Sequence, residues 1–287
     1  MNNAEYKLNL PLLIGKYLDP LLAEIQNEKG VDFKIENYNQ NYDELFLKNL
    51  GSRFISSIYS KSWRVIEAAS LAYLEFIDWY TTLYIIPEII FKITIEVAQV
   101  CFIYENRNIF INGLKILSKL LFNENDNIDK DFLNDTLISL GKQLILKSTS
   151  LNQSDKEMAL NTIISFYLLK ESDKEKFLRS LLIEDSPNYS SKTNTLPDKI
   201  TLTKLELLDI FLKRYYSYEN HKNFNWYYYF NSFLAPLLSH ERIEIRYVCI
   251  EILLQLYKLF GVSVINVLNN YKRIHPKVLA TILEKIS

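Results

Sequence analysis

The chain has 287 residues, 48% of them hydrophobic, which is long enough for one large domain or a continuous array of repeats. Its 33 basic and 34 acidic residues give a formal net charge of -1, so there is no global basic signal for nucleic acid and no acidic tail. Six glycines are too few for the strand-to-helix turns of a parallel-sheet enzyme, and this scarcity favours long helices.

The N-terminal segment lacks a charged start followed by a long apolar core, so we do not expect a signal peptide. Residues 1–43 predict a capping region of one or two helices and a loop over 27–42, a stretch rich in Asn, Glu and Tyr. We expect residues 44–287 to form one domain of repeats, because no linker interrupts them.

From residue 44 onwards, segments with the apolar spacing of a helix recur regularly. Their starts are about 41 to 47 residues apart, which is close to the unit length of HEAT and armadillo repeats. We therefore predict an all-α fold, an α-solenoid of about five to six HEAT repeats with capping helices at both ends. The segments begin near Arg64, Arg107, Ser154, Thr201 and Arg242.

Each segment follows an apolar partner helix, expected at 45–59, 87–104, 132–146, 174–183 and 226–238. Small residues recur at a similar place in four of the second helices, where they would let the partner helix approach closely; they are Ala68, Gly113, Ala159 and Cys249.

The helix boundaries have their own signals. Ser154 with Glu157 resembles a capping box, and Pro276 opens a final helix that runs to Ile286. The polar stretch 183–202, which contains Pro187 and Pro197, predicts a loop inside the fourth repeat.

Two further patterns concern the compartment. The apolar run 83–95 is interrupted by Pro87, Glu88 and Lys92, so it is too short and too polar to cross a bilayer. Cys101 and Cys249 both lie in apolar helical patterns, which indicates buried thiols and a reducing compartment.

Sequence signatures of enzymes are missing. The six glycines are isolated, so no nucleotide-binding glycine motif is present, and neither GxSxG nor HExxH occurs. The three histidines are far apart and have no cysteine partners at zinc spacing. We expect no catalysis, no cofactor and no metal, and His240 is either a solvated turn residue or a contact to a partner.

The turns that join the two helices of one repeat, called intra-repeat turns below, are more informative. In a stack of helical hairpins these turns share one edge, and here their summed charge is mildly basic, whereas the turns between repeats are acidic. This favours an acidic protein partner on the basic edge. Trp63 lies in the first intra-repeat turn beside Lys61 and Arg64, and it is either folded back onto its repeat or exposed as a binding anchor.

Short motifs at both ends of the repeat array resemble TOG domains. Residues 60–69, SKSWRVIEAA, are similar to the turn Trp and following E-A helix of the first TOG repeat. Residues 234–261 resemble a late TOG repeat at Leu237, Leu238, His240 and Arg246. The TOG region of a ciliary-tip protein has a similar S-x-S-W start and a similar ending, matched here by Ile245-Arg246, Leu256-Tyr257 and Gly261.

The resemblance implies a paddle of HEAT repeats whose intra-repeat turns bind tubulin, in a cytoskeletal protein of the cytoplasm at the cilium tip, centriole or basal body. Other ciliary-tip proteins are further expected partners, and neither nucleic acid nor membrane is. Glu105 and Glu241 weaken the basic edge relative to many TOG domains. The alternative is a HEAT scaffold that binds a non-tubulin protein or peptide. The resemblance assigns tubulin contacts to Trp63, Asn106, Arg107, Lys156, Lys204, His240 and Arg242. Lys61 and Arg64, the cations beside Trp63, complete the predicted tubulin-binding residues.

Overall fold

A computed structural model describes residues 10–29, 51–83, 88–121, 130–168, 174–183, 195–214, 224–271, 274 and 276–286. Every regular element within these ranges is a helix, which confirms the predicted all-α fold class. Contacts divide the chain into two compact units. Unit 1 comprises Met1–Asp135 and Asn161–Glu171, and unit 2 comprises Thr136–Leu160 and Ser172–Ser287.

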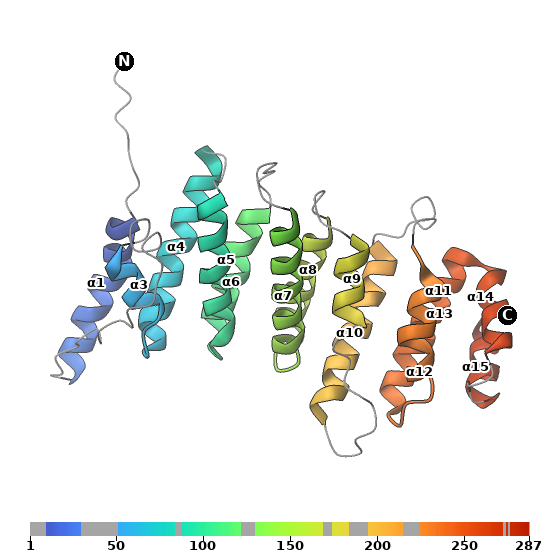
Figure 1. Cartoon of the computed structure of the whole chain (residues 1–287). Coiled ribbons are helices and arrows are strands. Elements are labelled where there is room, and N and C mark those ends of the chain that lie inside the picture. Colours follow the sequence, from blue (N-terminus) through green and yellow to red (C-terminus); the bar gives the residue numbers. More distant parts are fainter. Residues whose placement is uncertain are drawn as a thin grey trace. The chain divides into compact units, whose positions relative to one another are not determined.

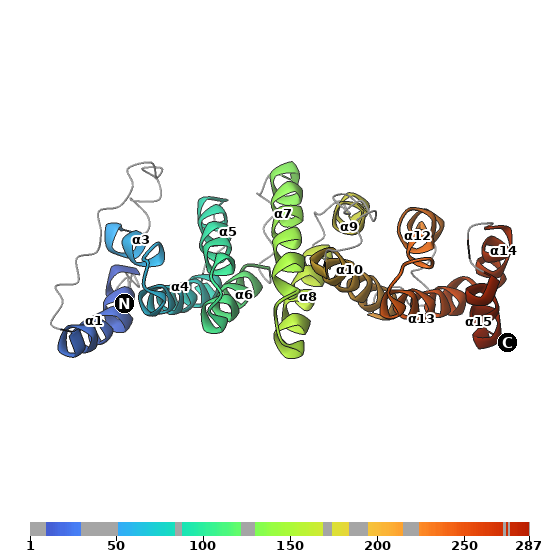
Figure 2. The same ribbon diagram turned by 90° about the horizontal axis from the view of Figure 1, so that it is seen from below.

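The described part of unit 1 contains two helical hairpins and an N-terminal helix. The helix α1 packs against α3 and α4, while α6 packs against both α4 and α5. Figure 2 shows α3 and α5 in one layer of this unit and α4 and α6 in the other. The helices are α1 (Leu10–Lys29), α3 (Ser52–Ile58), α4 (Trp63–Leu83), α5 (Glu88–Ile103) and α6 (Arg107–Leu121).

The approach of α5 to α6 depends on Gly113. A Cβ atom at this position would lie 2.7 Å from Cβ of Cys101 and 3.0 Å from the ring of Phe102, closer than packed side chains come. The predicted role of a small residue in admitting the partner helix is therefore confirmed at this position. Buried hydrogen bonds fix the register nearby, since Asn112 Nδ2 donates to Ser70 Oγ over 2.9 Å between α6 and α4.

Unit 2 contains the later repeats. The helix α10 packs against α9 and α13, and α13 in turn packs against α14 and α15 (Figure 1). The helices are α9 (Lys174–Leu182), α10 (Thr195–Arg214), α11 (Trp226–Tyr229), the π-helix η2 (Phe230–Leu234), α12 (Ala235–Leu237), α13 (Ile243–Phe260), α14 (Val262–Asn270) and α15 (Pro276–Ile286). Two more helices, α7 (Lys130–Ser148) and α8 (Gln153–Leu168), contribute residues to both units.

The predicted loop at 183–202 is wrong in its second half. The helix α10 already begins at Thr195, and Pro197 lies in its first turn, where the missing N–H removes no helical hydrogen bond. Residues 184–194 lie outside the described part of the chain.

The capping box is also displaced from the predicted pair. The cap of α8 is Asn152, whose Oδ1 accepts from the backbone N–H of Asp155 at 3.0 Å and whose Nδ2 donates to the Asp155 carboxylate at 2.9 Å. Ser154 lies inside the helix, because the chain already turns helical at Gln153.

The N-terminal and C-terminal regions differ from the prediction in detail. Helix α1 runs through Lys29, into the start of the predicted 27–42 loop, and the rest of that loop is not described. Near the other end, α14 was not predicted. It follows Gly261, whose φ of 60° lets one residue end α13 and begin α14. The predicted final helix Pro276–Ile286 is confirmed as α15.

The two thiols lie in the core. Cys101 and Cys249 are buried and carry no disulfide. Burial raises the pKa of the Cys101 thiol to about 12 and also raises the pKa of Cys249. Among the described residues, no helix combines the length and the apolar character needed to cross a membrane.

Candidate functional site

The first intra-repeat turn presents Trp63 to solvent. Trp63 is the first residue of α4, and 48% of its surface is exposed. The turn is shaped locally: the N–H of Ser62 donates to Ser60 Oγ at 3.1 Å, and the Ser62 carbonyl accepts from the N–H of Val65 and Ile66, both at 3.1 Å. The guanidinium carbon of Arg64 lies 5.7 Å from the centre of the Trp63 ring. Trp63 is thus not folded into the core.

The second intra-repeat turn lies beside the first. The hydroxyl of Tyr104 donates to the carbonyl of Ser60 over 3.4 Å, which joins the two turns. Asn106 caps α6, since its Oδ1 accepts from the N–H of Asn108 at 2.9 Å and of Ile109 at 3.3 Å. Asn106, a predicted partner contact, therefore has a structural role as the cap of α6.

Both charged and apolar side chains are exposed at these two turns of unit 1. Lys61 and Arg107 are exposed cations, and Glu105 is an exposed anion between them in the chain order. Ile103, the last residue of α5, is 76% exposed and was not among the predicted contact residues. Trp63 and Ile103 thus give neighbouring turns an apolar surface bordered by charge.

Lys204 and Lys156, the candidates of unit 2 outside its last turn, are held within the unit. Lys204 is only 5% exposed and its ammonium donates to the carbonyl of Leu182 at 3.3 Å. The assignment of Lys204 to a partner contact is therefore wrong for this structure, because a partner cannot reach the ammonium. Lys156 Nζ lies 2.6 Å from the Glu206 carboxylate, and its side chain is 15% exposed.

The last intra-repeat turn, between α12 and α13, is also occupied by internal contacts. Arg242 Nε lies 2.7 Å from one oxygen of Asp198, and His240 Nε2 lies 3.6 Å from the other. The guanidinium of Arg246 donates to the carbonyls of His240 and Glu241 at 2.5 and 2.8 Å. His240 is half-buried in this arrangement and is not a fully solvated turn residue.

Ile243, the first residue of α13, lies on this turn and is 67% exposed. Ile243 was also not among the predicted contact residues, although the sequence carries a signal for its exposure. Ile243 stands outside the helical spacing of Ile245, Cys249 and Ile252, which are all buried. An isoleucine off the buried face at a helix start indicates an exposed apolar side chain.

Within the described ranges, no group of three or more His, Cys, Asp or Glu side chains is arranged to hold a metal ion. His221 and His275 lie outside those ranges.

Known proteins resemble this chain in structure. No family model and no curated protein matches the sequence. A solved CEP104 TOG domain superposes with a TM-score of 0.62 over 84% of this chain and 91% of that chain. A TOG domain of Zyg9 from C. elegans superposes with a TM-score of 0.61 over 94% of each chain. The chain has the fold of a TOG domain.

The sequence identities of these TOG domains to the chain are 18% for CEP104 and 14% for Zyg9, so the likeness concerns the fold. The short sequence motifs had pointed the same way, because the ciliary-tip protein they resemble is the centrosomal protein of 104 kDa, CEP104. The TOG fold confirms the predicted class of helical hairpin repeats.

Proposed function

We propose that the chain is a tubulin-binding TOG domain and that Trp63 is an anchor of the contact. The observation that carries the proposal is the exposed indole on the first intra-repeat turn of a TOG-like fold. Large aromatic side chains and arginines are the residues that most often dominate binding energy at protein interfaces. An indole kept in solvent by a hydrogen-bonded turn is already ordered for binding, which reduces the entropic cost of association.

The proposed contact includes cations of both units. Lys61, Arg64 and Arg107 border the indole in sequence and on the joined turns, and they suit an acidic protein surface. In unit 2, Lys156 and Arg242 already have carboxylate partners. Both ion pairs are partly exposed, so an acidic partner would replace their carboxylates, and Lys156 and Arg242 remain part of the proposal, whereas the buried Lys204 does not.

The proposal extends to the setting of the protein. By its resemblance to a ciliary-tip TOG protein, we place the chain in the cytoplasm on the microtubule cytoskeleton, at the cilium tip, centriole or basal body. Tubulin and microtubules are its proposed partners, with other ciliary-tip proteins beside them.

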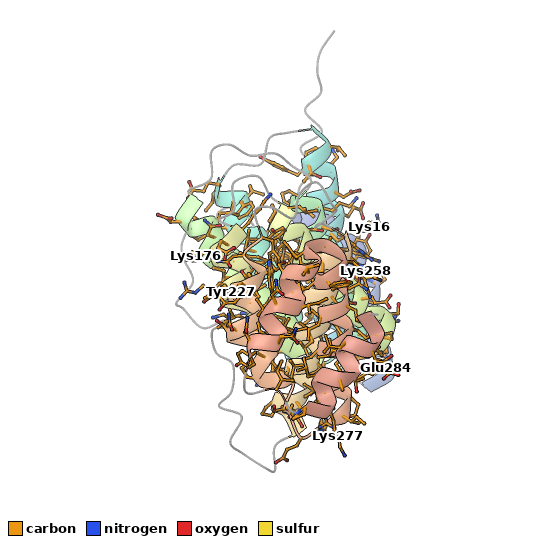
Figure 3. The ribbon with its side chains drawn as sticks, turned by 90° about the vertical axis from the view of Figure 1, so that its right-hand side faces the viewer. Lys16, Lys176, Tyr227, Lys258, Lys277 and Glu284 are labelled. Atoms are coloured by element: carbon orange, nitrogen blue, oxygen red, sulfur yellow. The ribbon has the colours of Figure 1, made fainter. Side chains whose placement is uncertain are left out.

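A titration of fluorescent tubulin dimer with the wild type and with Trp63→Ala tests the proposal. Loss of the indole should weaken binding by at least about 1 kcal/mol, which is roughly fivefold in Kd. Tyr227→Ala is the matched control, because Tyr227 on α11 is 55% exposed and belongs to no intra-repeat turn (Figure 3). We expect the control to bind like the wild type.

A wild type that does not bind tubulin at micromolar concentrations would contradict the proposal. So would equal binding by the wild type and Trp63→Ala. The engaged cations of unit 2 favour one other candidate, a HEAT scaffold for a non-tubulin protein or peptide, since they leave less free charge for an acidic partner. A pulldown dominated by other proteins and insensitive to Trp63→Ala would support that scaffold.

A further inference from the structure

Ile243 and Trp63 occupy the same position in their repeats. Each is the first residue of the second helix of a hairpin, directly after an intra-repeat turn, and each is a large apolar side chain exposed to solvent. Trp63 begins α4 in unit 1, and Ile243 begins α13 in unit 2. The equivalent residues of α6 and α8 are the polar Arg107 and Gln153.

The turn beneath Ile243 is held from several sides. The carboxylate of Asp198 on α10 forms an ion pair with the guanidinium of Arg242. The backbone N–H of Arg242 donates to Nδ1 of His240 at 3.2 Å. Arg246, one turn further along α13, donates to two carbonyls of the same turn. The backbone that presents Ile243 is therefore fixed in place, while its side chain contributes little to the core.

These contacts also change the chemistry of the turn. The sequence alone suggests a cationic contact through His240 and Arg242, but both face Asp198. The neighbouring Glu241 and Glu244 are exposed and acidic. A partner that approaches this turn meets an isoleucine in a setting that is not basic, so its gain in free energy comes from removing apolar surface from water.

We propose that Ile243 is a second apolar anchor for tubulin, which contacts the last intra-repeat turn through this side chain and not through its cations. The inference rests on the proposed function, and it assigns one apolar anchor to each unit. Apolar contacts are insensitive to ionic strength, whereas contacts between exposed charges are screened by salt. The contribution of Ile243 is accordingly independent of salt.

The test is a tubulin titration with Ile243→Ser and a matched control, Val262→Ser. Val262 is 64% exposed, belongs to the same unit and is also the first residue of its helix. It follows the other end of α13, about 27 Å from Ile243 for a helix of 18 residues. Ile243→Ser should raise Kd at least about fivefold, and Val262→Ser should stay within about twofold of the wild type.

The same titration at about 50 and 300 mM salt separates the two kinds of contact. The ratio of Kd between Ile243→Ser and the wild type should be the same at both salt concentrations. A ratio that falls towards one at high salt would overturn the apolar role, and so would equal losses for Ile243→Ser and Val262→Ser.

The failure of this inference is distinguishable from failure of the proposed function. If Trp63→Ala weakens binding and Ile243→Ser does not, the second anchor is refuted while the proposed function stands. If the wild type does not bind tubulin, the proposed function fails and the inference fails with it. Unchanged circular dichroism and thermal unfolding of Ile243→Ser would assign its loss to the interface, because exposed substitutions leave the fold intact.

Discussion

Exposure differs sharply between single residues that the sequence predicts as partner contacts. Trp63 and Ile243 are exposed, although large apolar side chains elsewhere in the repeats fill the core. Lys204 is the opposite case, since it is buried and its ammonium donates a hydrogen bond to the carbonyl of Leu182 inside unit 2. The type of a residue in the sequence is thus a poor guide to its availability for a partner, which depends on the helix it lies in and on neighbours contributed by other helices.

The buried thiols offer a residue-scale prediction. Because their pKa values lie above the ordinary 9.0, both thiols stay protonated at pH 8, and burial denies reagents access to them. N-ethylmaleimide should modify neither Cys101 nor Cys249 in the native protein and both in denaturant, as measured by mass spectrometry. An adduct on either cysteine of the folded protein would contradict the packing described for α5 or α13.

Close helix contact is a property of elements, and it gives a second prediction. Gly113→Ala introduces a Cβ that meets Cys101 and Phe102, so we expect it to lower the free energy of unfolding by about 1–3 kcal/mol. The control is Gly15→Ala on α1, where the nearest atom, 3.1 Å away, is an oxygen at the end of the exposed Asp19 side chain, which a small shift of its ion pair with Arg53 can accommodate. Alanine should stabilise that helix by about 0.5–1 kcal/mol. Chemical denaturation measures both, and equal effects of the two substitutions would refute the close contact.

Sequence periodicity predicted the elements well where they bury one face. The starts of α4, α6 and α8 are confirmed to within one residue, because a polar turn precedes a long apolar stripe in each case. It failed at α10, where Pro197 suggested a loop although proline is tolerated in a first helical turn. It also missed α14, because a single glycine separates that helix from α13.

The candidate site was less predictable than the fold. The candidate role of Trp63 could be predicted from its place in a turn between two helices. The ion pairs of Lys156 and Arg242 could not, because their carboxylate partners are distant in sequence. Glu206 and Asp198 both come from α10, and only the packing of α10 in unit 2 shows that they meet these cations. A sum of the charges of turn residues, taken from the sequence, does not show which cations these carboxylates of α10 pair with, and so does not give the positive charge open to a partner.

At the scale of the whole molecule, a net charge of -1 gives little long-range attraction for any partner. The proposed binding therefore depends on local surfaces at the turns, where Trp63 is exposed in unit 1 and Ile243 in unit 2. This is the central claim of the proposed function: the intra-repeat turns, and not the outer faces of the helices, contact tubulin.

Hydrogen–deuterium exchange of the unmodified protein, with and without tubulin dimer, tests that claim most directly. We predict slower exchange in peptides that contain residues 59–64, 103–107 and 239–243, because bound tubulin shields these turns. Peptides from α14 should exchange at the same rate in both states. Protection of α14 without protection of the turns, or no protection anywhere at saturating tubulin, would contradict the account.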